Sequence, residues 1–292
     1  MTDFLPAARV LITQLILGAI NGSFYALMSL GLSIIFGLLR VVNFAHGAQY
    51  MLGAFVAWGL LEFLGVGFWW SLLIAPLVVA GFGILLERTM LRRLYSVDHV
   101  YALLLTFGIS LVLEGLFRMR FGATGQPFPN PIQGGLDTAI VYLPWYRLFV
   151  IGMSLFVCLG TWFAIERTAL GSYLRAAQEN PSLVRSFGIN VPRMLMLTYG
   201  LGVGLAGLSG VMAAPIYQVS PLMGVNLTIT VFAVVVIGGM GSIIGSIVAG
   251  FGLGLLEGLT KVLYPDGVGI VVFVAMIIVL ALKPNGLFGA AD

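Results

Sequence analysis

The sequence has very few charged residues, and between Arg193 and Glu257 no Asp, Glu, Lys, Arg or His interrupts it. Only 9% of the 292 residues are charged, 60% are hydrophobic, and the mean hydropathy is +1.08. A water-soluble domain needs a charged surface, so this composition predicts a chain that crosses a membrane many times. A span needs about 20 apolar residues, so this uncharged stretch alone has room for two or three spans.

Residues suited to covalent or metal chemistry are also scarce. The single cysteine, Cys158, excludes an intramolecular disulfide and is expected to be a packing residue. The two histidines, His46 and His99, are far apart and predict neither a metal cluster nor a nucleophile–base pair. We therefore expect no catalytic residue and no metal site. The net charge of +3 is too small to indicate a nucleic-acid partner.

The phosphate-binding motif Gly-x-x-x-x-Gly-Lys-Ser/Thr is missing as well. Neither of the two lysines, Lys261 and Lys283, has the neighbours that this loop requires. Any ATP must therefore be bound by another chain, and we expect this chain to bind no cofactor itself.

What the sequence does contain is a series of uncharged runs, each about the length of a span. The first, 10–39, lacks the features of a cleaved signal peptide and is interpreted as a retained span. Together the runs predict an all-α, polytopic bundle of about eight spans with broken or re-entrant helices, in a single domain covering residues 1–292. The further runs are 41–61, 63–86, 100–113, 148–165, 194–256 and 267–282.

Arginine clusters predict the orientation of the chain. They fall in the loops 87–99 and 166–193, and positive residues collect on the cytoplasmic side. The proline-rich loop 127–135 is then expected on the opposite face. Lys283 favours a cytoplasmic C-terminal end; eight spans would also place the N-terminal end inside, whereas nine would place it outside.

The longest polar loop, 166–193, contains the signals of a short helix. Asn180 and Pro181 fit an N-cap and a first helical position, and Gly188 fits a C-terminal stop. Leu183, Val184 and Phe187 are predicted to share one apolar face. Such a helix could dock in a groove of a cytosolic partner, or it could pack on its own bundle or on lipid headgroups.

Two patches inside apolar regions are candidates for the translocation pathway. The first patch contains Asn43, His46 and Gly47. Asn43 could cap a broken helix that starts near Phe44 and points its positive end at the carboxylate of a substrate. The alternative is that Asn43 and His46 satisfy backbone groups and join two helices.

Gly238, Gly239 and Gly241 form the second patch, followed by Gly245 four residues after Gly241. This spacing predicts close helix packing. The adjacent glycines also allow an unwound segment in the pathway.

Three acidic residues, Glu62, Glu114 and Glu257, lie at or beside apolar runs. They are the candidates for coupling a proton or sodium ion, which would make the chain a self-sufficient secondary transporter or channel. The first two are expected near span ends, and Glu257 is expected to pair with Lys261 on a helix surface.

Four segments together resemble the LivH-type permeases of ATP-binding-cassette importers for branched-chain amino acids, and the resemblance covers essentially the whole chain. The most specific is the polar loop, with Arg175-Ala176-Ala177, Asn180-Pro181 and Gly188-Ile189-Asn190. The other segments are Val42–Gly47 with Met51–Ala54, Ile237–Gly245 and Pro284–Gly289.

The resemblance implies a multi-pass protein of the bacterial cytoplasmic (inner) membrane that moves a small amino acid inward by alternating access. It implies a second, LivM-like permease, two cytosolic LivG-like and LivF-like ATPases that use ATP and Mg, and an outer substrate-binding protein. It also implies that loop 166–193 couples the chain to the ATPases. The coupling residues would be Arg175, Ala176, Asn180, Pro181, Val184, Gly188 and Ile189.

Overall fold

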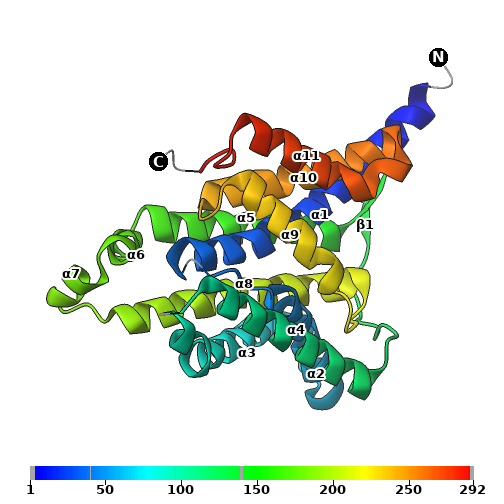
Figure 1. Cartoon of the computed structure of the whole chain (residues 1–292). Coiled ribbons are helices and arrows are strands. Elements are labelled where there is room, and N and C mark those ends of the chain that lie inside the picture. The colour runs from blue at the N-terminus through cyan, green and yellow to red at the C-terminus, as the bar shows by residue number, and fades with distance from the viewer. Residues whose placement is uncertain (1–3, 40, 96, 139–140, 290–292) are drawn as a thin grey trace.

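The computed structural model describes residues 4–39, 41–95, 97–138 and 141–289, and most of them are helical (Figure 1). The α-helices are α1 (Phe4–Leu39), α2 (His46–Leu64), α3 (Phe68–Thr89), α4 (His99–Phe121), α5 (Trp145–Glu166), α6 (Ala169–Glu179), α7 (Pro181–Ser186), α8 (Val191–Tyr217), α9 (Val225–Gly238), α10 (Ile243–Leu263) and α11 (Val268–Leu282). Two 3-10 turns, η1 (Leu91–Leu94) and η2 (Pro265–Gly267), and a hairpin of β1 (Gly135–Asp137) and β2 (Tyr142–Pro144) complete the fold.

Eight helices of the described chain are long and apolar enough to cross a membrane, as the sequence predicts. They are α1 to α5, α8, α10 and α11, the third and the last being extended by the adjoining 3-10 turns. The fold is therefore an all-α, polytopic membrane bundle. Helices α4, α5 and α11 expose most of their apolar surface, and lipid is expected to cover it.

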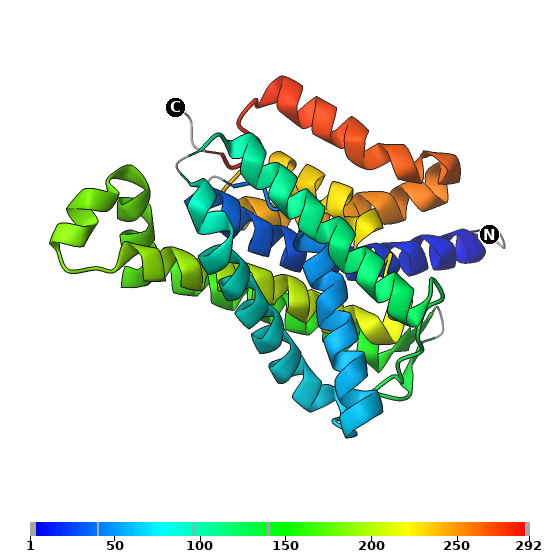
Figure 2. The ribbon, with the colours of Figure 1, turned by 60° about the horizontal axis from the view of Figure 1, so that its bottom comes forward.

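Helix α9 has only 14 residues, about 21 Å, yet it completes a further crossing. Its C-terminal end continues to Gly241, which packs against Gly37 near the end of α1. Its N-terminal end is joined to α8 by residues 218–224, where Val219 pairs with Gln126 of the loop at the opposite end of the bundle. With α9 included, the described part of the chain thus runs nine times between the two ends of the bundle, and α1 begins at the end opposite to the C-terminal segment (Figures 1 and 2).

Small residues bring the central helices into backbone contact. A Cβ atom added at Gly254 of α10 would lie 2.4 Å from the carbonyl oxygen of Gly18 on α1. The hydroxyl of Ser29 donates to the carbonyl of Ser246 at 3.2 Å farther along the same pair of helices. Because lipid offers no hydrophobic drive for helix association, such close packing and interhelical hydrogen bonds stabilise the bundle.

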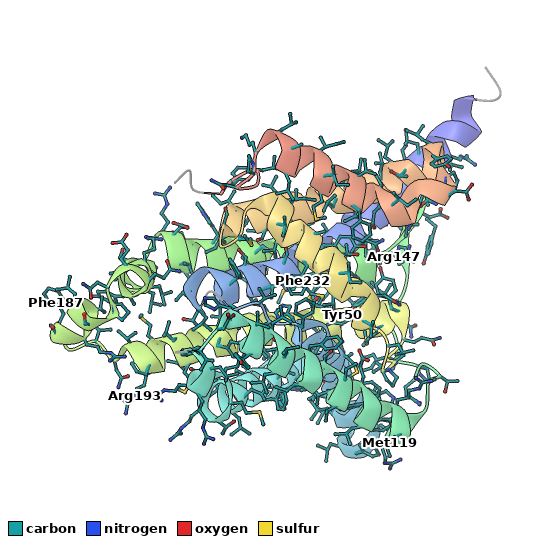
Figure 3. The ribbon with its side chains drawn as sticks, viewed as in Figure 1. Tyr50, Met119, Arg147, Phe187, Arg193 and Phe232 are labelled. Atoms are coloured by element: carbon teal, nitrogen blue, oxygen red, sulfur yellow. The ribbon has the colours of Figure 1, made fainter. Side chains whose placement is uncertain are left out.

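Helices α6 and α7 project from one end of the bundle (Figures 1 and 2). In Figure 3, Arg193 lies at this end and Arg147 at the other. More of the described arginines lie at this end than at the opposite end, which predicts that the projecting end is the cytoplasmic one. Those described at this end are Arg88, Arg92, Arg93, Arg167, Arg175, Arg185 and Arg193, against Arg9, Arg118, Arg120 and Arg147 at the other.

Nine passes give a specific accessibility pattern. In a Cys158→Ser background, Val10→Cys and Thr124→Cys are expected to react with a membrane-impermeant maleimide added to intact spheroplasts, whereas Ser186→Cys reacts only after permeabilisation. Thr124 and Ser186 are exposed at opposite ends of the bundle. Labelling of Ser186→Cys and Val10→Cys from the same side would contradict the ninth crossing.

Candidate translocation and coupling sites

The helices α2 and α9 both begin deep inside the bundle and meet at their first turns. His46, the first residue of α2, hydrogen-bonds through Nε2 to the carbonyl of Met28 at 2.9 Å. Met28 lies 11 residues before the end of α1, roughly 16 Å along the helix and therefore about halfway through a 30 Å hydrocarbon core. A Cβ atom at Gly47 would lie 2.5 Å from the carbonyl oxygen of Gly224, the N-cap of α9. A helix thus begins inside the bundle near Phe44, as predicted. The prediction that Asn43 is its N-cap is wrong, because Ala45 takes that position and makes no side-chain cap.

The unwound segment before α2 is held by side chains from two other helices. Phe44 donates its backbone N–H to Thr106 of α4 at 3.1 Å, and its ring stacks on Phe232 of α9, with centroids 4.7 Å apart. Figure 3 shows Phe232 in the centre of the molecule. Because unpaired backbone groups are costly in a membrane, these contacts compensate for the missing helix turn.

Asn43 and His46 are fully buried in this junction. The Asn43 side chain accepts from Ala45 N at 3.1 Å and donates to Gln49 Oε1 at 3.0 Å. His46 Nδ1 is buried and has no hydrogen-bond partner in the described part of the chain. Neither residue lines the outer or the inner cavity described below, and the contacts match the alternative in which both residues satisfy polar groups and join helices. Their role in translocation stays a prediction, as does that of Gly47.

A cavity of about 360 Å³ lies beside the first turn of α9, toward the outer end of the bundle. We call it the outer cavity. It combines tyrosine hydroxyls, two amides and a serine with aliphatic and aromatic surface. Its lining residues are Asn21, Phe24, Tyr25, Tyr50, Tyr217, Ser220, Leu222, Met223, Asn226 and Leu227.

The glycine patch forms an unwound turn between α9 and α10. Gly239 and Gly241 have φ values of +102° and +88°, which side chains disfavour, and α10 starts only at Ile243. Gly241 and Gly245 therefore do not form a four-residue packing motif on one helix, because Gly241 lies in the turn before α10 begins. Gly238 nevertheless packs directly on Gly245, since a Cβ atom there would lie 2.5 Å from its carbonyl carbon.

The C-terminal segment seals the end of α9. Leu287 N donates to the carbonyl of Ile237 at 2.8 Å and Phe288 N to that of Gly238 at 3.1 Å. These bonds satisfy carbonyls that a helix end leaves free. The Pro284–Gly289 motif after the last span therefore has a structural role, because it closes the C-terminal end of α9.

A second cavity, of about 530 Å³, opens at the cytoplasmic end between α1, α5, α6 and the turn before α10. We call it the inner cavity. Of the glycines predicted for the pathway, only Gly241 lines it. Arg175 of α6 also lines it and forms an ion pair with Glu166 at 3.2 Å.

Helix α7 forms as the sequence predicts. The side chain of Asn180 accepts from Leu183 N at 3.0 Å, Pro181 is the first residue, and Gly188 follows the helix with a φ of +79°. Gly188 N donates to the carbonyl of Arg185 at 2.9 Å and closes the turn. Capping residues of this kind stabilise a helix too short to persist by itself.

The predicted apolar face of α7 is divided. Val184 is only 5% exposed and packs with Ala177, Val191 and Ile189 inside the projection. Leu183 and Phe187 are 54% and 76% exposed. The prediction that the three side chains share one face is therefore wrong. Val184 points inward to α6 and α8, whereas Leu183 and Phe187 are exposed.

The remaining predicted coupling residues, Ala176 and Ile189, differ in exposure. Ala176 is exposed on α6 and Ile189 is half-buried after α7. Figure 3 shows Phe187 at the far tip of the projection. Exposed apolar groups at such a tip can enter a groove on another protein.

The acidic residue Glu257 does not form the predicted surface pair. It is 7% exposed and accepts hydrogen bonds from the Tyr25 hydroxyl at 2.9 and 3.1 Å. Glu62 is exposed in the last turn of α2, and Glu114 is half-buried on α4.

The outer cavity was not predicted from the sequence, because its tyrosines come from separate helices. The signal that the sequence offered was the polarity of these tyrosines within apolar runs.

A polytopic helical bundle with two broken helices meeting at mid-depth, a cavity on each side and a projecting cytoplasmic helix pair defines a membrane transport protein. The family model for the branched-chain amino acid transport system permease component matches residues 14–280. The chain belongs to this family, and it is a multi-pass membrane permease component.

Curated relatives extend along the whole chain. The high-affinity branched-chain amino acid transport system permease protein BraD of Pseudomonas aeruginosa is 28% identical over 303 residues, 99% of each chain. The LivH permease of that system in Escherichia coli K12 is 28% identical over 296 residues, 96% of each chain. Its LivM permease is also 28% identical, over 75% of this chain and 57% of its own. No solved structure matches the chain with statistical significance.

The junction of α2 and α9 should tolerate no side chain at Gly47. Gly47→Ala would force the added methyl into Thr228 Oγ1, 2.0 Å away, and into backbone. Overpacking of this kind costs about 1–3 kcal/mol, so we expect a lower melting temperature in detergent and a loss of transport.

Gly59→Ala on the same helix is the matched control, because its nearest neighbour atoms lie 3.8 Å away on the flexible Phe63 ring. It should behave like the unmodified protein. Equal stability of the two variants, measured by fluorescence-detected size exclusion after heating, would refute the packing of this junction.

Proposed function

We propose that this chain is one of two membrane subunits of an ATP-binding-cassette importer in a bacterial cytoplasmic membrane and that it carries branched-chain or related small amino acids inward. The observation that carries the proposal is the projecting pair α6–α7, with Leu183 and Phe187 exposed at its tip, in a chain of this permease family. A second permease, two cytosolic ATPases and an outer binding protein would complete the assembly.

The existence of a second permease is supported by the relatives. LivH and LivM of Escherichia coli are both named as permease proteins of one high-affinity branched-chain amino acid system, and both are similar to this chain. LivM is the longer of the two, since the match covers only 57% of it. A heterodimer of related subunits is the assembly we propose for this chain.

The coupling step would be mechanical. ATP and Mg would be bound by the partner ATPases, which close around the nucleotide and displace α6–α7. Because Leu174, Arg175 and Gln178 of α6 line the inner cavity together with Ser33 of α1, a shift of α6 would reach the spans directly. This is a rigid-body gating step without covalent chemistry.

The competing function is an ion-coupled secondary transporter. It needs a carboxylate that is alternately exposed to the two sides of the membrane. Glu257 accepts hydrogen bonds from Tyr25, and Glu62 lies at the end of a span. Transport that persists in liposomes without any ATPase would favour this alternative.

Removing the exposed aromatic ring at the tip should uncouple the assembly. In proteoliposomes with all subunits, Phe187→Ala is expected to lower amino-acid transport at least tenfold, because aromatic anchors in docking grooves contribute about 2 kcal/mol or more. ATP hydrolysis should no longer respond to loaded binding protein.

Phe156→Ala is the matched control, since Phe156 is 73% exposed on the lipid-facing surface of α5 and should be neutral. Val184→Ala is expected to loosen the projection itself, whereas Arg175→Ala breaks only an exposed ion pair. Full coupling in Phe187→Ala would refute docking at this tip.

A further inference from the structure

We infer that the outer cavity is a binding site in the permease itself for an amino-acid zwitterion with an aliphatic side chain, held by its carboxylate on the first turn of α9 and by its ammonium among tyrosine hydroxyls. The inference rests on the proposed transport of small amino acids and adds the residues that would recognise them. The site is distinct from Asn43 and His46, which do not line this cavity.

The size of the cavity suits such a ligand. Its volume of about 360 Å³ lies at the lower end of the range of roughly 300–1,000 Å³ that small-molecule sites occupy. Residues of α1, α2, α8 and α9 and of the loop before α9 enclose it, so it sits where broken and continuous helices meet. Such junctions are where transporters place their substrates.

Tyr50 adds a polar group to this space from α2. The side chain is 1% exposed and is one of the residues that line the cavity. Figure 3 places Tyr50 in the interior of the bundle. A hydrogen bond between a tyrosine hydroxyl and a charged ligand group in such a desolvated place would add to the affinity.

One wall of the cavity can accept a carboxylate. Gly224, the N-cap of α9, makes no side-chain cap, and the amides of Asn226 and Leu227 belong to the first turn, where a helix has no internal acceptors. Both residues line the cavity. The positive end of the helix dipole adds to the attraction for an anion.

The opposite wall offers acceptors for an ammonium group. The Tyr25 hydroxyl donates its hydrogen to Glu257, so its oxygen remains free to accept. The Tyr217 hydroxyl likewise donates to Asn21 Oδ1 at 2.5 Å. The carboxyl group of Glu257 lies behind Tyr25, and the faces of aromatic rings also attract a cation.

The remaining surface is apolar. Phe24, Leu222, Met223 and Leu227 border the same space. A branched aliphatic side chain could pack there, and methionine adapts to side chains of different shape. The helix N-terminus, the tyrosine hydroxyls and the apolar side chains together match an aliphatic amino acid.

Saturation-transfer NMR with L-leucine, which detects weak binding, tests the site on the complete transporter in nanodiscs without its binding protein. Binding is expected in the unmodified assembly. Tyr50→Phe removes one hydroxyl and should raise the dissociation constant about tenfold, the effect of one hydrogen bond to a charged group. Leu227→Trp should fill the cavity and abolish the signal.

Tyr146→Phe is the matched control. Tyr146 is also 1% exposed, but its hydroxyl donates to the carbonyl of Met212 at 2.7 Å, away from the outer cavity. Its loss should leave the dissociation constant unchanged. Leucinamide, which lacks the carboxylate, and 4-methylpentanoate, which lacks the ammonium group, should give no signal.

Transport assays in proteoliposomes distinguish the possible failures. If the unmodified assembly transports L-leucine but shows no binding without its binding protein, or if Leu227→Trp binds and transports like the unmodified protein, the site is refuted and the proposed function stands. If the complete assembly transports no branched-chain amino acid, both are refuted.

Discussion

The backbone contact between Gly47 and Gly224 is the constraint on which the rest of this structure depends. Two helices can start in the middle of a membrane only if their flanking segments find partners for the polar groups that a continuous helix would satisfy. Here the side chains of Thr106 and Asn43 accept from the backbone N–H groups of Phe44 and Ala45 on the α2 side. The absence of both Cβ atoms allows the two first turns to touch.

The shape of the molecule follows from this contact. Because α9 starts at mid-depth, its 14 residues suffice to reach the cytoplasmic end, and the loop before it descends from the outer end to form a wall of the outer cavity. The same arrangement turns the positive end of α9 toward that cavity. Burial of Gly47 and Gly224 therefore has an electrostatic consequence as well as a packing one.

At the cytoplasmic end, an ion pair and a small apolar cluster hold the helices together. Helix α6 packs over the inner cavity, and the ion pair of Arg175 with Glu166 joins it to the end of α5. Val184 then fixes α7 to α6 and α8 through a small apolar cluster. The projection is therefore a unit connected to the spans, which is what a mechanical coupling element requires.

Local features of this fold could be predicted from the sequence, whereas features made by distant helices could not. The uncharged runs gave the spans, and Asn180, Pro181 and Gly188 gave α7, because capping depends on neighbouring residues. The inward position of Val184, the interruption before Ile243 and the Tyr25–Glu257 pair depend on tertiary packing. For the same reason the outer cavity, built from four helices, had no recognisable motif.

The central claim is that the α6–α7 tip binds an ATPase, and photo-cross-linking at position 187 tests it most directly. With Phe187 replaced by benzoylphenylalanine in cells that express the native partners, mass spectrometry of the adduct should identify a phosphate-loop ATPase, and the same replacement at Phe156 should give none. Adducts only with lipid, or the same ATPase recovered from both positions, would contradict the account.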